Sequence, residues 1–212
     1  MGMYVRTQDI TALQSRLIHM INSGASTLVP AEKEELKQRL LDPTTSTEIW
    51  ERMLKEEGIR SVWRVVPSKN TDFAHLRDGW MNGIKRAIQD SKTAKSHDAL
   101  AAPGAEYEDE SFGLAVRNFK ELFTGGGRTA KGSVVLLRRN HDGSLEIMFN
   151  DPKKGDALDT LGKVSDPRIS RLVWMGYLAG KNVSSEPARK AVVEGFVGFA
   201  GRPVGSVETM VR

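Results

Sequence analysis

The stretch that most constrains the fold is "GSVVLLRRNHDGSLEIMF", residues 132–149. Two runs rich in aliphatic and β-branched residues flank the dipeptide Asp142-Gly143. That dipeptide is typical of the tight turn between two antiparallel strands. The stretch therefore predicts a β-hairpin, and the fold of this chain has to include an antiparallel sheet.

Most of the remaining sequence has the apolar spacing of helices. In the segment after Pro67, apolar residues from Phe73 to Ala87 lie on one helical stripe that Asn70 or Thr71 can cap. We expect that helix to end near Gln89. Helices are expected over 7–21, 30–41, 45–57, 70–89, 111–123, 167–180 and 184–199, a further strand over 59–67, and loops over 91–110 and 150–166. Helices combined with an antiparallel hairpin predict one α+β domain over residues 1–212, with 91–110 as an inserted loop.

Composition excludes several classes of site. The 212 residues include no cysteine and only four histidines, so a thiolate nucleophile is excluded and a multi-histidine metal site is not expected. The net charge is +4, but acidic residues interrupt the basic ones, and we expect no nucleic-acid binding. No apolar run reaches the roughly 20 residues that a membrane-spanning helix needs.

The segment "NTDFAHLRDGW", residues 70–80, holds the histidine of most interest. His75 lies in the first turn of the expected helix, between Asp72 and Asp78, off the apolar stripe. It can be a solvated partner of those carboxylates, or a ligand at a site beside the helix. Elsewhere "TGGGRTAKGS" lacks the spacing of a phosphate-binding loop, and a helix exit is the better interpretation.

Several segments together resemble one family. These are "GSVVLL", "DGSLEIMF" and "ISRLVWMGYLAGKNVSSEPARKAVVEGF", preceded by "RVVPSKNTDFAHLRDGW" and, near the start, "GMYV". In order and spacing they resemble the chalcone isomerase family, in the form of its fungal mitochondrial members. The resemblance implies an open-faced β-sandwich: an antiparallel sheet with a helical layer on one side and a pocket between them. It also implies that the family's opening strands lie before Met1.

The resemblance argues against catalysis. In the plant enzymes, a tyrosine and an asparagine over the pocket help to cyclise a chalcone. Counted from Pro67, these positions fall on Phe73 and Trp80, and the small hydroxyl residue before the Gly-Lys turn falls near Tyr177. Phe73 and Trp80 cannot stabilise a developing phenolate or enolate as those donors do. The arginine and threonine of the site would precede Met1, which also weakens a fatty-acid-binding role.

The fungal members are associated with haem, and they carry an extra loop where residues 91–110 lie here. The resemblance therefore implies a haem pocket, or a pocket for another planar apolar ligand, with His75 as the ligand of the iron. The residues expected to form it are His75, Phe73, Leu76, Trp80 and Tyr177 at the iron and macrocycle, and Arg64, Arg77 and Lys85 at the propionates.

The leading hypothesis is thus a non-catalytic chalcone isomerase-like protein that binds haem. The alternatives are a chalcone-type isomerase and a fatty-acid-binding protein. Resemblance also implies a mitochondrial location at the inner membrane. Any membrane association is expected to come from a segment that this chain does not contain.

Overall fold

The structure is a computed structural model, and it describes residues 1–93, 104–125, 127–155 and 157–204. Its centre is an antiparallel sheet with the strand order β1-β2-β5-β6-β7. The strands are β1 (Gly2–Val5), β2 (Ser61–Val65), β5 (Val134–Arg139), β6 (Leu145–Asn150) and β7 (Asp159–Val164), with a separate pair β3 (Thr71–Asp72) and β4 (Arg128–Thr129). The predicted hairpin is confirmed as β5 and β6, and Gly143 in its turn has a φ of +76°.

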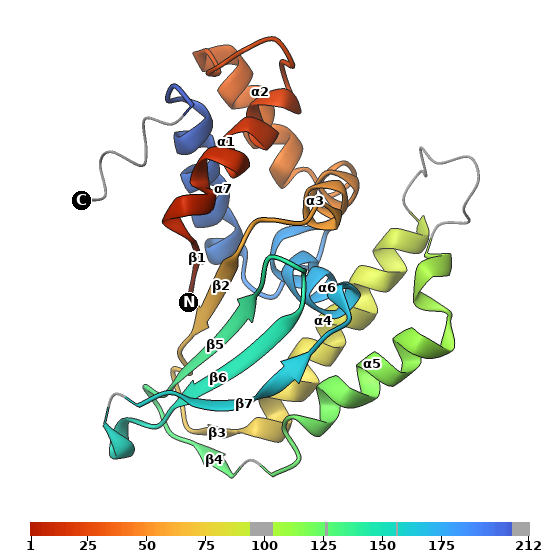
Figure 1. Ribbon diagram of the computed structural model, residues 1–212, viewed down its shortest axis with the longest axis vertical. Coiled ribbons are helices and arrows are strands. Elements are labelled where there is room, and N and C mark those ends of the chain that lie inside the picture. The colour runs from red at the N-terminus through yellow and green to blue at the C-terminus, as the bar shows by residue number, and fades with distance from the viewer. Residues whose placement is uncertain (94–103, 126, 156, 205–212) are drawn as a thin grey trace.

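Helices cover one face of the sheet and gather at one end of it (Figure 1). They are α1 (Ile10–His19), α2 (Pro30–Leu41), α3 (Ser46–Lys55), α4 (Phe73–Thr93), α5 (Glu110–Glu121), α6 (Pro167–Leu178) and α7 (Glu186–Ala200), with short 3-10 turns at Thr7–Asp9, Ala105–Tyr107 and Pro152–Lys154. In Figure 1, α4 and α6 lie behind the sheet, while α1, α2, α3 and α7 lie above it.

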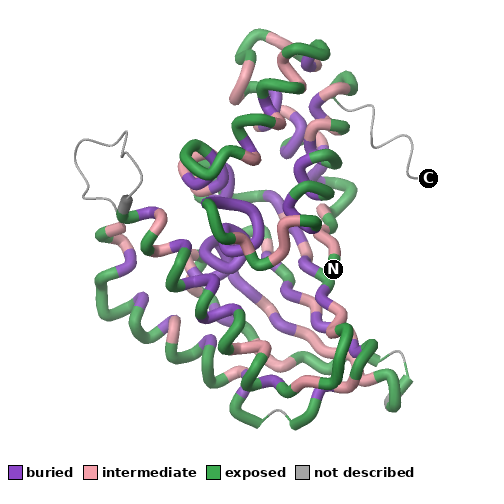
Figure 2. Tube along the Cα trace, turned by 180° about the vertical axis from the view of Figure 1, so that it is seen from behind, coloured by how far each residue is buried: buried purple, intermediate pink, exposed green. Residues whose placement is uncertain are grey.

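Helix α6 is the centre of the core. Every residue from Ile169 to Leu178 is buried, as expected for a helix that is packed on all sides. Figure 2, which views the molecule from behind, shows buried residues concentrated at its centre, where α6 lies in front of the strands. The indole N–H of Trp174 donates to Ser61 on β2 at 3.0 Å, which ties the helix to the sheet.

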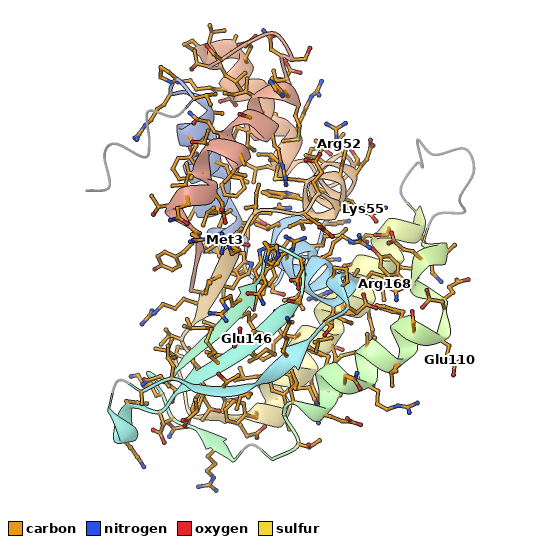
Figure 3. The ribbon with its side chains drawn as sticks, viewed as in Figure 1. Met3, Arg52, Lys55, Glu110, Glu146 and Arg168 are labelled. Carbon is orange, nitrogen blue, oxygen red and sulfur yellow. The ribbon has the colours of Figure 1, made fainter. Side chains whose placement is uncertain are left out.

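Among the described residues, none forms a helix over the other face of the sheet. On β5, Val135, Leu137 and Arg139 are buried toward the helices, while the alternate residues are partly or fully exposed. Arg138 and Glu146 form an ion pair on this uncovered face (Figure 3). One covered and one open face make this an open-faced sandwich of the α+β class, as predicted.

The structure corrects three local predictions. The cap of α4 is Asp72, whose Oδ1 accepts from the backbone N–H of His75 at 2.7 Å. The side chain of Asn70 accepts instead from the backbone N–H of Lys131. Helix α4 continues to Thr93, beyond Gln89, and Ser91 in this extension is buried.

The third correction concerns the two predicted loops. Strand β7 lies inside 150–166, where a polar sequence with a glycine gives little β signal; pairing with β6 orders this edge strand. The inserted loop was predicted over 91–110, but 91–93 belong to α4 and 105–107 form a 3-10 turn. Positions 94–103 of that prediction lie outside the described residues.

Candidate functional site

A surface groove of about 460 Å³ lies where α4 meets the end of β2 and the turn after α6. This volume is within the range of small-molecule sites, and the groove is broadly open to solvent. Its lining residues are Met1, Val65, His75, Leu76, Gly79, Trp80, Asn82, Arg86, Tyr177, Val183 and Ser184.

One face of α4 forms the long wall of the groove. His75, Gly79, Asn82 and Arg86 follow one another at intervals of four, three and four residues, which places them in a single row on a helix. The row begins at the cap, since Asp72 fixes the first turn of α4. Gly79 leaves the middle of the row without a side chain, so a flat molecule can approach the helix backbone there.

Aromatic side chains close the inner end of the groove. The indole N–H of Trp80 donates to the hydroxyl of Tyr177 at 2.9 Å, and both side chains are buried. The Tyr177 ring stacks on Trp63 of β2, with 4.5 Å between ring centroids and 27° between planes. Burial raises the pKa of the Tyr177 hydroxyl, so it stays protonated near neutral pH.

These aromatic rings also fill the space between the sheet and the helical layer. Trp63 has no exposed surface, and Tyr177 and Trp80 are only 4% and 6% exposed. The pocket that was expected between sheet and helices is therefore occupied by side chains at this point. The groove at the margin of the two layers takes its place.

His75 lies at the outer end of the groove. Its side chain is exposed, and the imidazole makes no hydrogen bond to any described residue. The predicted contact with the neighbouring carboxylates is limited to one hydrogen bond, which the backbone N–H of His75 donates to Asp72. The imidazole is therefore available to a ligand in the groove.

The structure brings together four of the predicted site residues and separates the others. His75, Leu76, Trp80 and Tyr177 all line the groove. Phe73 does not; it is a core residue, packed edge-on against Phe149 at 4.8 Å between centroids.

The predicted cations lie away from the groove lining. Arg64 extends from the uncovered face of β2, because it alternates with the buried Trp63 and Val65. Arg77 is held by Asp78, its neighbour in sequence, at 2.8 Å. Lys85 is exposed on α4, one residue off the row that faces the groove.

The cation that does line the groove is Arg86, which the sequence prediction missed. The sequence did contain an indication of this role. Arg86 follows His75 by eleven residues, which is about three helical turns, so both residues lie on the same face of α4. Val183 and Ser184 were missed as well, because only the turn after α6 brings them to α4. Within the described residues, no three His, Cys, Asp or Glu side chains are placed to hold a metal ion.

Comparison with known proteins identifies the fold. The family model described as chalcone isomerase like matches residues 1–193. The chain belongs to the chalcone isomerase-like family. A solved structure, the fatty-acid binding protein AtFAP1 of Arabidopsis thaliana, matches this chalcone isomerase-like chain with a TM-score of 0.59. The match covers 93% of this chain and 77% of that one, at 12% sequence identity, and it supports the fold.

The chalcone isomerase-like chain is also similar to fungal proteins named altered inheritance of mitochondria protein 18, mitochondrial. It is 31% identical over 199 residues to the Debaryomyces hansenii protein, and 29% identical over 199 residues to that of Vanderwaltozyma polyspora. These matches cover 93% and 92% of this chain, but only 60% and 57% of the relatives. The resemblance to the fungal mitochondrial branch is thereby confirmed.

Proposed function

We propose that this chalcone isomerase-like domain binds a planar apolar ligand in the groove beside α4, and that it does so without catalysing a reaction on it. The observation that carries the proposal is the composition of the groove. It combines an aromatic inner end at Trp80 and Tyr177 with an available imidazole at His75 and a cation at Arg86. Such a mixture of apolar wall and few polar groups is typical of small-molecule sites.

Haem is the ligand that this set of residues fits best. The imidazole of His75 would hold the iron, a common role for histidine. Leu76, Trp80 and Val183 would lie against the macrocycle, and Arg86 would meet a propionate in place of the predicted Arg64, Arg77 and Lys85. When bound, haem would supply redox or gas-binding chemistry. The protein's own contribution would be to fix its orientation and to keep water from one of its faces.

Two observations speak against the alternative functions. An isomerase would need polarised donors over the substrate, but Phe73 is packed into the core and the indole N–H of Trp80 is already committed to Tyr177. A fatty-acid carrier would need a deep apolar cavity, and Trp63, Trp80 and Tyr177 fill the interior here. A carboxylate ligand that is short and flat remains compatible with Arg86.

The location of the protein is part of the proposal. The names of the fungal relatives place those proteins in mitochondria, and we propose the same compartment, at the inner membrane, for this one. Among the described helices, none is both long and apolar enough to cross a bilayer. Subfractionation of mitochondria with an antibody against this chain tests the proposed location; recovery outside the inner-membrane fraction would contradict it.

The ligand proposal is tested by titrating the purified chain with haemin and following the Soret band. We expect saturable binding, and a band that shifts or disappears in His75→Ala. The matched control is His141→Ala, which removes an exposed imidazole in the β5–β6 turn, far from the groove in sequence and outside its lining. An unchanged band in His75→Ala would reject His75 as ligand, and absence of any band would reject haem.

A further inference from the structure

The contact between Trp80 and Tyr177 has a direction that chemistry fixes. An indole nitrogen carries a hydrogen and can only donate, whereas a phenol can donate and accept. At 2.9 Å the Trp80 N–H therefore donates, and the Tyr177 oxygen accepts. The proton of the Tyr177 hydroxyl must point away from Trp80.

That proton has no acceptor among the described residues. The structure gives the hydroxyl one hydrogen bond only, the one that it accepts from Trp80. Tyr177 is only 4% exposed, yet it contributes to the lining of the groove. A buried donor without an acceptor is costly, and such donors are normally satisfied in a folded protein or by what it binds.

The ring is also held in place. It stacks on Trp63 of strand β2, which is paired on both sides in the sheet, and its backbone belongs to the buried part of helix α6, Ile169 to Leu178. Since both the ring and the accepting direction of the oxygen are fixed, the donated proton has a narrow range of directions. This makes the hydroxyl a preorganised donor at the inner end of the groove.

From this geometry we infer that Tyr177 is the polar anchor of the groove and selects planar ligands that carry a carboxylate at their inner edge. The inference rests on the proposed function, because it assumes that the groove binds a planar ligand. A carboxylate is favoured over a neutral oxygen because Arg86 lines the same groove and contributes a positive charge. A hydrogen bond to a charged acceptor is stronger than one to a neutral acceptor.

The test compares two fluorescent probes of the same shape, 1-pyrenecarboxylate and 1-methylpyrene. We expect the wild-type chain to bind the carboxylate about 10-fold or more tightly than the methyl compound, as for one charge-assisted hydrogen bond. In Tyr177→Phe this preference should fall toward parity, while the affinity for 1-methylpyrene stays unchanged. The control is Ser184→Ala, which removes the other hydroxyl of the lining and should keep the preference.

The outcomes separate this inference from the proposed function. Binding of both probes without preference, or a preference that survives in Tyr177→Phe, overturns the role of Tyr177 while the groove remains a ligand site. A preference lost in Ser184→Ala alone assigns the anchor to the turn after α6, and also overturns it. Failure of both probes to bind overturns the proposed function and this inference together.

A second variant covers the case in which Tyr177→Phe does not fold. Trp80→Phe removes the indole that directs the phenol, and leaves the phenol itself in place. The preference for the carboxylate should then fall but not vanish, because the direction of the Tyr177 hydroxyl proton is no longer fixed by the indole. An unchanged preference in Trp80→Phe would contradict the inferred direction of the Tyr177 proton.

Discussion

Helices α4 and α6 cross beside the groove, and the same substitution at two glycines of this crossing should change the free energy of unfolding by different amounts. Gly83 on α4 and Gly176 on α6 face each other there. Gly176 directly precedes Tyr177, and Gly83 follows Trp80 by three residues, so the crossing sets the spacing of the Trp80–Tyr177 hydrogen bond. We predict that Gly83→Ala stabilises the protein and that Gly176→Ala destabilises it relative to Gly83→Ala.

The magnitudes follow from the space around each glycine. A Cβ on Gly83 would have Ser184 Oγ at 3.8 Å and Gly176 Cα at 3.9 Å, which is ordinary contact. Alanine should therefore gain about 0.5–1 kcal/mol from helix propensity. A Cβ on Gly176 would lie 3.3 Å from Gly83 Cα and 3.5 Å from its carbonyl carbon. These are backbone atoms, which cannot relieve a close contact by changing rotamer. Overpacking of this kind costs about 1–3 kcal/mol.

The assay is equilibrium unfolding in urea followed by far-UV circular dichroism. Because alanine gains at most a similar helix propensity at both positions, the difference between the two variants isolates the crowding at the crossing. We expect that difference to be about 1–3 kcal/mol in the free energy of unfolding, with Gly83→Ala the more stable. Equal stabilities of the two variants, or Gly83→Ala below the wild type, would refute the packing described here.

Three further substitutions test the site and its frame. Tyr177→Phe leaves the buried Trp80 N–H without its acceptor and should lower the free energy of unfolding by about 1–3 kcal/mol in a urea titration; no loss would mean that the hydrogen bond does not form. Asp109 caps α5, and its hydrogen bond with Arg168 lowers the pKa of the carboxyl to about 2. The stability that it contributes is present above its ordinary pKa of 3.8 and is lost as the pH falls toward 2, so thermal melts of Asp109→Ala and wild type should converge in acid. A Cβ at Gly143, where φ is +76°, would lie 2.5 Å from Pro167 Cβ, so Gly143→Ala should lower the free energy of unfolding by more than about 1 kcal/mol; an unchanged melting temperature would contradict this.

Arg168 connects the N-terminal ends of helices α5 and α6. The guanidinium of Arg168, labelled in Figure 3, binds two cap residues: Asp166 before α6 at 2.6 Å and Asp109 before α5 at 2.7 Å. The Asp109 variant therefore tests more than one helix cap, because it also releases one arm of this connection. Because Arg168 lies on α6 and Asp109 precedes α5, the predicted convergence of the two melting curves in acid has to be measured on the whole chain.

Much of the fold could be predicted from local sequence. The hairpin at Asp142-Gly143 and the helix starts at Pro30 and Pro167 depend on residues close together in the chain, and the structure contains all three. Strand β7 could not be predicted this way. It is a polar edge strand, so its order comes from pairing with β6 rather than from its own composition.

The candidate site was only partly predictable for a similar reason. The row from His75 to Arg86 obeys helical spacing and could have been extended from the sequence. The contact between Trp80 and Tyr177 joins residues 97 positions apart, and no local pattern reports it. Arg64 was expected at the propionates, but alternation along β2 sends its side chain to the face of the sheet opposite to that of the buried Trp63.

The central claim is that the groove beside α4 receives a planar ligand. The most direct measurement is a backbone NMR titration of the isotope-labelled chain with gallium protoporphyrin IX, a diamagnetic counterpart of haem. We predict saturable shifts that concentrate on the α4 row from His75 to Arg86 and on Tyr177 to Ser184. Shifts confined to other surfaces, or none at all, would contradict the proposed function.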